Sequence, residues 1–271
     1  MSIGILNNIS SLIAENAVSN TQASLNSTLQ QLSTGLKINS GSDDAAGLSI
    51  ADGLGANIAA LSQSSQNASD GIGLLQTADG ALSAVTTQLN RATTLATEAG
   101  NGGLSTAQST ALDTEFQSIL SEITQIGATT NFNGTAVFGA SATTFTSDGT
   151  TTGATTTTTA IAALTPAALG LTGNLLTSAA AQTALTAITA AISTISANRG
   201  AIGASVNQLT ADSNVQNTEV QNLTGAQNNI RNADIATTTS NLTQFNILEQ
   251  TGFAALSQSR QAQENVLKLV Q

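Results

Sequence analysis

The sequence predicts a mainly α fold: a long antiparallel helical rod or coiled-coil bundle with paired terminal helices and a small β-hairpin excursion. Three observations lead to this prediction. Apolar residues recur at helical spacing near both ends of the chain, two interior segments carry them in alternating steps of three and four, and a Thr-rich segment separates those interior segments. Steps of three and four place residues on one helix face, whereas Thr favours strands.

The first helix is expected over residues 8–36, where an 11-residue step links Ala14, Leu25 and Leu36. The segment after Asp234 has the same step, at Phe245, Leu256 and Leu267. Eleven residues over three turns is about 3.67 residues per turn, which is typical of nearly straight helix pairs. An apolar stripe that reaches a chain end is buried against something or it frays. The terminal helices are therefore expected to pair and to leave faces for neighbouring copies.

The two interior segments predict a pair of long helices. Apolar and small residues step by three and four over 54–96, and again over 185–230. At 1.5 Å per residue, each segment would be about 65 Å long, and the equal lengths favour side-by-side packing. Asp43 and Asp44 precede the first segment. They are expected to cap its helix rather than to form a catalytic carboxylate pair.

Between these long helices the sequence predicts a shorter helix and then a Thr-rich segment. Ser105 with a Gln three residues later predicts a capping box, and Gly127 is the expected C-cap of the short helix that follows. Asn133-Gly134 is a strong hairpin signal. A β-rich or loose insertion is therefore expected at about 128–180. Its many Thr residues are either acceptors for O-linked sugars or part of a weakly ordered surface loop.

Composition excludes several classes of function. Of 271 residues only 8% are charged, and sixteen acids against six bases give a net charge of −10. This balance argues against a nucleic-acid partner and against an anionic membrane surface. No run of 18 apolar residues predicts a membrane span, and the first residues lack the basic and apolar regions of a signal peptide.

The absence of His and Cys limits the chemistry further. A His-Glu-x-x-His zinc motif and thiol nucleophiles are both impossible. General acid–base catalysis usually draws on His or on perturbed carboxylates in a cleft, and no such constellation is visible. We therefore expect no enzyme activity, no cofactor and no metal site.

Several motifs, in order along the chain, resemble bacterial flagellin, the subunit of the flagellar filament. They are LSTGLKINS at 32–40, DDAAG at 43–47, NASDGI at 67–72, NFNG at 131–134 and QENVLKL at 263–269. The resemblance covers about 1–138 and 180–271. Only some fifty residues separate these parts, so the chain resembles a short form that lacks the large outer domains.

The resemblance implies a secreted, extracellular structural protein that polymerises into the filament for swimming motility. It implies that 1–41 and 235–271 form a terminal coiled-coil domain in the filament core, with 42–234 as a helical rod domain. It also implies the flagellar type III export apparatus, a chaperone, the filament cap and hook-associated proteins as partners. The residues expected to bury their side chains on self-assembly are Leu25, Leu29, Leu32, Leu36, Leu242, Phe245, Phe253, Leu256 and Leu267.

The family resemblance also implies a role for three residues of the rod domain. Arg91, Leu95 and Glu115 match positions that, in many flagellins, face outward and are recognised by an innate immune receptor. Ser118 and Ile119 depart from that pattern, which has Gln and Arg there. The alternative is a solvated Arg and Glu with no partner.

Two other functions remain compatible with the sequence. A hook–filament junction protein has similar ends but forms only one short ring of subunits. A secreted adhesin-like binding module would use the Thr-rich segment for contact and the helices as a scaffold.

Overall fold

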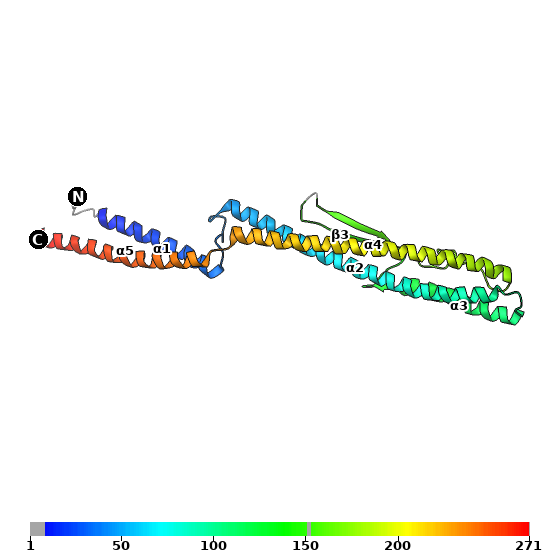
Figure 1. Ribbon diagram of the computed structural model, residues 1–271. Coiled ribbons are helices and arrows are strands. Elements are labelled where there is room, and N and C mark those ends of the chain that lie inside the picture. Colours follow the sequence, from blue (N-terminus) through cyan, green and yellow to red (C-terminus); the bar gives the residue numbers. More distant parts are fainter. Residues whose placement is uncertain (1–8, 151–152, 271) are drawn as a thin grey trace. The chain divides into compact units, whose positions relative to one another are not determined.

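The computed structural model describes residues 9–150 and 153–270, without the side chains of 266, 267, 269 and 270. Over these residues the chain forms five helices and four strands (Figure 1). The helices are α1 (Ile9–Thr34), α2 (Ala45–Ala99), α3 (Thr106–Thr129), α4 (Ser178–Arg231) and α5 (Ile235–Val270). The strands are β1 (Asn131–Phe132), β2 (Thr135–Ala136), β3 (Ser141–Thr146) and β4 (Thr155–Ala160). The predicted mainly α fold is confirmed.

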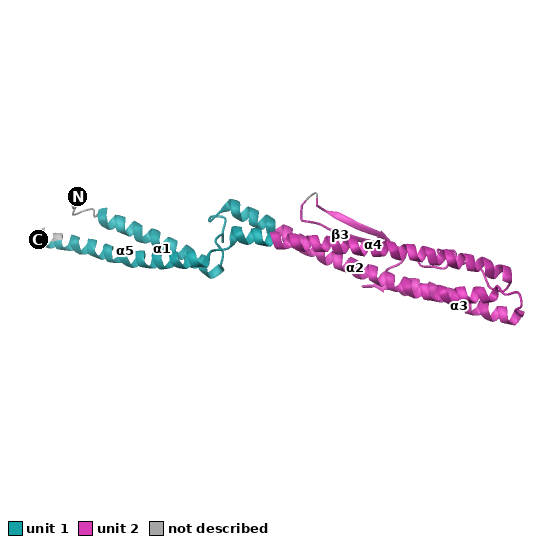
Figure 2. Ribbon diagram, in the orientation of Figure 1, with its two compact units in different colours: residues 1–55, 223–271 teal, residues 56–222 magenta. Residues whose placement is uncertain are grey.

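The chain divides into two compact units (Figure 2). Unit 1 combines residues 1–55 with 223–271, and unit 2 consists of residues 56–222. The long helices α2 and α4 therefore contribute residues to both units.

In unit 2, α2 and α4 run antiparallel in a fixed register. Three contacts define it: Ser65 with Ser213, Asp79 with Arg199, and Ser178 with the backbone carbonyl of Gly100. Between the first two contacts α2 advances fourteen residues, from 65 to 79, while α4 retreats fourteen, from 213 to 199. Because fourteen residues are two heptads, the same helix faces meet at both levels. The predicted pairing of the two long helices is confirmed.

The core of unit 2 is built from aliphatic side chains of α2, α3 and α4. Its fully buried members include Leu75, Val85, Leu89, Phe116, Ile123, Ile188 and Ile195. Among the described helices, α4 alone has the length and mean hydropathy that a membrane crossing requires. Its apolar residues Ile188, Ile195 and Leu209 are buried in this core, and 28% of its most apolar stretch is buried.

Helix α3 begins as predicted and ends differently. Ser105 and Gln108 form the expected capping box. Gly127, predicted as the C-cap, lies inside the helix, and Thr130 is the C-cap instead. A Cβ at Gly127 would clash with the backbone carbonyl oxygen of Leu164. The glycine therefore permits a close approach of another segment, and the predicted C-cap is wrong.

The Thr-rich insertion forms two antiparallel hairpins. Asn133 and Gly134 both have positive φ, 50° and 79°, and they connect β1 to β2 as the dipeptide predicts. Strands β3 and β4 pair from Ser141↔Ala160 to Thr146↔Thr155. This second hairpin lies against α2, where Ser64 Oγ donates to the carbonyl of Ser147 at 2.7 Å.

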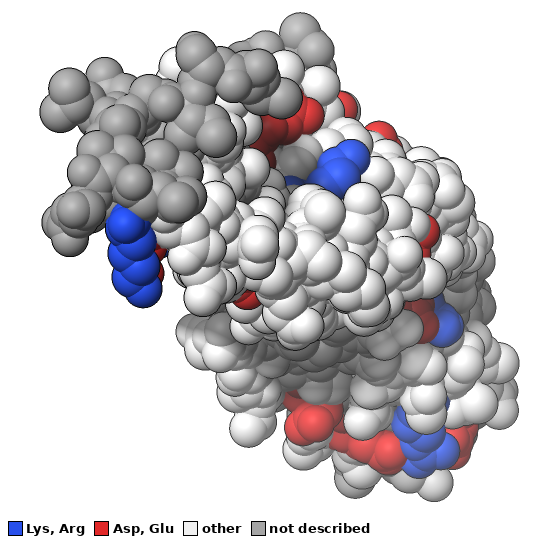
Figure 3. Space-filling model, turned by 90° about the vertical axis from the view of Figure 1, so that its left-hand side faces the viewer, with Lys and Arg blue, Asp and Glu red and all other residues white. Residues whose placement is uncertain are grey.

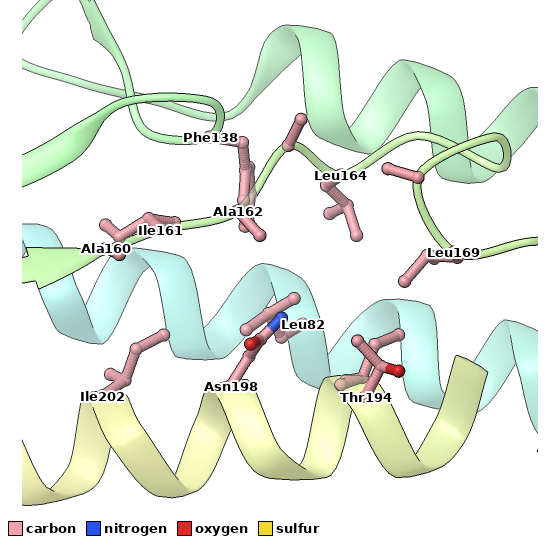
Figure 4. Close-up of a pocket in the computed structure, with 13 residues that line it drawn as sticks. Leu82, Phe138, Ala160, Ile161, Ala162, Leu164, Leu169, Thr194, Asn198 and Ile202 are labelled. Atoms are coloured by element: carbon pink, nitrogen blue, oxygen red, sulfur yellow. The ribbon is translucent and has the colours of Figure 1, made fainter. Parts of the chain in front are cut away.

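Residues 161–177, which we call the strap, connect β4 to α4. The expectation of a loose insertion is wrong for this segment, because Ile161, Leu164, Leu171 and Leu175 are buried in the core of unit 2. The Leu175 N–H also donates to an Asp113 carboxylate oxygen on α3 at 2.8 Å. Figure 4 shows the start of the strap facing residues of α2 and α4 across a small cavity.

In unit 1, α1 and α5 pair antiparallel, as expected for the terminal helices (Figure 1). Helix α1 ends at Thr34 because Gly35 adopts positive φ (72°) and its N–H closes the last turn on Gln31. Leu36, predicted as part of the helical stripe, lies beyond the helix and forms an isolated bridge with Asn232. Its helical placement is therefore wrong.

Acidic residues fix the two remaining junctions of unit 1. An Asp44 carboxylate oxygen accepts from the Gly47 N–H at 2.9 Å and caps α2 as predicted. Asp43 does not cap the helix, because its carboxylate accepts from the N–H groups of Asn39 and Ser40 in the preceding loop. Asp234 caps α5 by accepting from the Ala236 N–H at 2.9 Å.

Candidate self-assembly site

The contact between α1 and α5 is a seam with alternating steps of three and four. On α1 the residues at least half-buried that follow these steps include Ala14, Val18, Thr21, Leu25, Thr28 and Leu32. On α5 they include Thr238, Leu242, Phe245, Glu249, Gly252 and Leu256. These steps define a heptad seam. The described pairs of the predicted 11-residue step, Ala14 with Leu25 and Phe245 with Leu256, both lie in this seam, because a step of eleven is a sum of steps of three and four.

Polar and small residues make up much of this seam. The Gln22 amide donates to the Glu249 carboxylate at 3.2 Å across the pair. Gly252 lets the helices approach closely, since a Cβ there would lie 2.6 Å from a methyl carbon of Val18. Six of the twelve seam residues named are large and apolar, but only Val18 among these six is buried, so the pair gains less hydrophobic stabilisation from its own contact than the fully buried core of unit 2 provides.

The outer faces of the same two helices carry large apolar side chains that are exposed. They are Ile9, Leu12, Ile13, Leu29, Ile235, Ile247, Leu248 and Phe253. Ile9 is 67% exposed and Phe253 is 48% exposed. Large apolar side chains left exposed in this number on two paired helices are typical of surface that another chain covers. We call these eight residues the outer apolar surface.

The residues predicted for self-assembly divide between the two surfaces. Those in the seam are Leu25, Leu32, Leu242, Phe245 and Leu256, all half-buried. Leu29 and Phe253 belong to the outer apolar surface. Leu36 is half-buried beyond the end of α1, and the side chain of Leu267 lies outside the described residues.

The predicted self-assembly residues did not include six members of the outer apolar surface, namely Ile9, Leu12, Ile13, Ile235, Ile247 and Leu248. Ile247 illustrates why. It lies between the seam residues Phe245 and Glu249, and about 100° per residue turns its side chain to the opposite face of α5. A search for apolar residues at helical spacing on one face of a helix leaves out residues on its other faces. A count of large apolar residues on every face of the helix would have found them.

The three residues of the predicted receptor patch do not share one environment. Arg91 of α2 and Glu115 of α3 are exposed and form an ion pair of 2.7 Å. This hydrogen bond raises the pKa of Arg91 and lowers that of Glu115. Leu95 is only 1% exposed and belongs to the core. Its expected outward orientation is therefore wrong. Arg91 and Glu115 pair with each other and remain exposed, so recognition by a receptor stays a prediction.

A second ion pair links the long helices. Arg199 of α4 donates to both carboxylate oxygens of Asp79 on α2, at 2.7 and 3.1 Å. The hydrogen bond from Arg199 lowers the pKa of Asp79. Elsewhere charge is sparse: on the face in Figure 3 most of the surface is uncharged, with a few scattered acidic and basic side chains. Few charges must therefore be desolvated when apolar surface is covered.

The described residues contain no arrangement typical of a catalytic site. No group of three His, Cys, Asp or Glu side chains within them is placed to hold a metal ion. The cavity under the strap measures about 80 Å³ and is lined mainly by apolar side chains, with Thr194 and Asn198 as polar neighbours (Figure 4). This cavity lacks the titratable groups that acid–base or nucleophilic catalysis requires.

Two family models match the chain. The bacterial flagellin N-terminal helical region matches residues 5–143, and the bacterial flagellin C-terminal helical region matches residues 185–270. The chain belongs to the bacterial flagellin family. The matched regions include all five helices except the first turns of α4, so the family relation extends over both units.

Flagellins of named bacteria support this membership. The chain is 33% identical over 267 residues to flagellin of Halalkalibacterium halodurans, an alignment that covers 96% of this chain and 97% of the relative. Flagellin 1 of Proteus mirabilis is 41% identical over 130 residues, which are 48% of this chain and 36% of that one. The crystal structure of Bacillus cereus flagellin superposes with a TM-score of 0.50 at 31% identity, covering 55% of this chain and 88% of that one.

Proposed function

We infer that the chain is the structural subunit that polymerises into the bacterial flagellar filament. Its family membership carries this conclusion, and the match along nearly the whole length of the Halalkalibacterium halodurans flagellin supports a short member of the family. The protein therefore acts by assembly rather than by catalysis, and it is located in the bacterial flagellum.

The terminal helices supply the affinity between subunits in this proposal. Residues 1–41 and 235–271 form the core domain of the filament, and 42–234 form the rod domain outside it. The outer apolar surface is covered by neighbouring copies. At about 25 cal/mol per Å² of apolar area, fully burying a large side chain contributes roughly 1.5–3 kcal/mol. Because each of the eight is already about half covered, together they supply roughly 6–12 kcal/mol before ordering entropy is subtracted. A head-to-tail contact of this kind extends without closing and gives a filament.

The finer features of the proposal follow the flagellin family. The subunit is secreted through the flagellar type III export apparatus with a chaperone, is added beneath the filament cap, and adjoins hook-associated proteins. The filament it forms serves swimming motility. An innate immune receptor that recognises the rod would engage Arg91 and Glu115, both exposed, but not Leu95, which is buried. A receptor reporter assay with Arg91→Ala monomer tests this contact, because an unchanged response would remove Arg91 from it.

Seeded elongation tests the main proposal. Purified chain is mixed with filament fragments, and filament length is followed by electron microscopy. Unmodified chain should elongate the seeds without limit. Phe253→Ser removes one member of the outer apolar surface and should slow elongation about tenfold or more, because the lost transfer free energy of ~1.5–3 kcal/mol corresponds to that ratio.

Phe145→Ser is the matched control. Phe145 is a similarly exposed Phe on β3 of unit 2, outside the terminal helices. Both variants should unfold at the same denaturant concentration as the unmodified chain, since neither side chain is buried. Elongation that stops after one short ring would support the hook–filament junction protein instead. A chain that ignores every seed would contradict polymerisation.

A further inference from the structure

A polar groove lies in unit 2 between the β3–β4 hairpin and α4, and assembly through the terminal helices makes no use of it. Its volume is about 390 Å³. The hairpin contributes the turn residue Asp148 and the Thr residues of β4, and α4 contributes Asp212, Gln216 and Glu219. We call this feature the hairpin groove.

The charge in the hairpin groove has one sign. Its described lining contains three carboxylates, those of Asp148, Asp212 and Glu219, and no Lys or Arg. The ion pairs found among the described residues, Arg91–Glu115, Arg199–Asp79 and Arg231–Asp52, all lie elsewhere. The groove therefore holds negative charge that no cation within the described chain balances. Its potential favours a positively charged ligand.

One buried side chain in the groove lacks a hydrogen-bond donor. Gln216 is only 9% exposed, and its Oε1 atom has no hydrogen-bond partner in the described structure. A buried amide oxygen without a partner is destabilising, and almost all such groups in folded proteins are paired. An N–H group that enters the groove and reaches Gln216 would remove this cost.

We propose that the hairpin groove binds a positively charged nitrogen group, a primary ammonium or a guanidinium, through Gln216, Asp212 and Glu219. The group donates one N–H hydrogen bond to Gln216 Oε1, and the two carboxylates balance its charge. Ammonium and guanidinium groups carry several donors and no acceptor, which matches a lining of oxygen acceptors. A bare metal ion fits less well, because no three carboxylates among the described residues are arranged to ligate one.

Two sources offer this chemistry: a free polyamine, and a Lys or Arg side chain of a neighbouring subunit. The monomer settles whether the site exists. Its ¹H–¹⁵N spectrum is titrated with butane-1,4-diamine, and the shift of the Gln216 side-chain amide is followed. We expect saturable shifts at Gln216 and along α4 around residue 216, and no comparable response to Mg²⁺ at the same ionic strength.

Variants then test the named residues. Asp212→Asn and Gln216→Leu should each weaken diamine binding about tenfold, since a hydrogen bond or contact to a charged group is worth roughly 1.5 kcal/mol or more. Gln216→Leu should leave the monomer as stable as before or more stable, because it removes an unpaired buried oxygen. Exposed Glu122 on α3 provides the control, and Glu122→Gln should bind the diamine like the unmodified chain.

Assembled filaments distinguish the two sources. If the diamine still binds to filaments, the ligand is a free amine. If filaments exclude the diamine and protect Asp212 and Glu219 from carbodiimide labelling, a side chain of a neighbouring subunit occupies the groove. Monomer that shows no saturable shift at Gln216, or that loses equal affinity in Glu122→Gln, would overturn the proposal. Because this assay uses monomer, its failure would leave the filament function untouched.

Discussion

Two antiparallel helix pairs in this molecule share a spacing and differ in what they bury. In unit 2, α2 and α4 meet through side chains such as Leu75, Leu89 and Ile195, which are fully buried. In unit 1, α1 and α5 meet with the same steps of three and four, but Thr28, Glu249 and other polar or small residues occupy much of the seam. The spacing of the apolar residues thus determines that the helices pair, whereas the residue types in the contact determine whether the pair has a fully buried apolar core.

The two units also differ in where their large apolar residues lie. Unit 2 places them inside, with α3 and the strap covering the pair formed by α2 and α4. Unit 1 places eight of them on the outer faces of its terminal helices. Unit 2 therefore has a core of its own, and unit 1 has surface that is suited to being covered by other copies of the chain.

The largest expected effect comes from truncating one Phe in each unit. Phe116→Ala removes a side chain that is 1% exposed and should lower the free energy of unfolding by about 3–5 kcal/mol. Phe253→Ala, on the outer apolar surface, should change it by less than about 0.5 kcal/mol. Urea denaturation of the monomer measures both. Equal losses would show that the terminal pair has a closed core.

A smaller effect is expected at Gly127, which faces the strap. A Cβ there would meet the carbonyl oxygen of Leu164, a backbone atom, so Gly127→Ala should destabilise unit 2 by about 1–3 kcal/mol. Gly80 on α2 is the control, because a Cβ there meets nothing within 4 Å. Gly80→Ala should stabilise the monomer by roughly 0.5–1 kcal/mol through helix propensity. A stabilised Gly127→Ala variant would mean that the strap is loosely packed.

In unit 1, replacing Gly252 by Ala should affect the stability of the monomer less than Gly127→Ala does. Gly252→Ala would press on a methyl group of Val18 rather than on backbone. The Val18 side chain must move by a few tenths of an ångström or more to make room, and the gain in helix propensity of about 1 kcal/mol offsets this cost. Thermal unfolding of the monomer should therefore change by less than about 1 kcal/mol. A loss as large as that of Gly127→Ala would indicate a rigid terminal seam.

The smallest effect concerns pH and the ion pair between α2 and α4. Arg199 lowers the pKa of Asp79 in the folded state, so the pair stabilises the fold above the ordinary Asp pKa of about 4. This stabilisation is lost as the pH falls through the lowered pKa. Because both side chains are partly exposed, solvent screening limits it to less than about 1 kcal/mol.

Unfolding free energies measured at pH 7 and pH 2.5 test this sign. The unmodified chain should lose more unfolding free energy between pH 7 and pH 2.5 than the Asp79→Asn variant does. Asp70→Asn, at an exposed position on the same helix, is the control. A variant that is as acid-sensitive as the unmodified chain would exclude a contribution from the pair.

The elements that sequence predicted well are those fixed by local chemistry. The capping box at Ser105, the Asn133-Gly134 turn and the pairing of the long helices each depend on residue types within a few positions or on a regular step. The family relation was equally accessible, because its motifs are contiguous.

What sequence did not predict depends on contacts between distant segments. Gly127 resembles a C-cap, and only the nearby Leu164 carbonyl explains why helix α3 continues through it. The strap looked loose because its leucines are separated by turn residues, yet its neighbours in space bury them. Leu95 was placed on the surface by analogy, although the packing of α2 puts it in the core.

Amide hydrogen exchange tests the central claim most directly, namely that the terminal helices complete their burial only between copies. In the monomer, amides of α1 and α5 should exchange far faster than those of α2 and α4 that lie in unit 2. In filaments, the terminal amides should become as slow as those of unit 2. Full protection of residues 9–34 in a lone monomer would contradict the account.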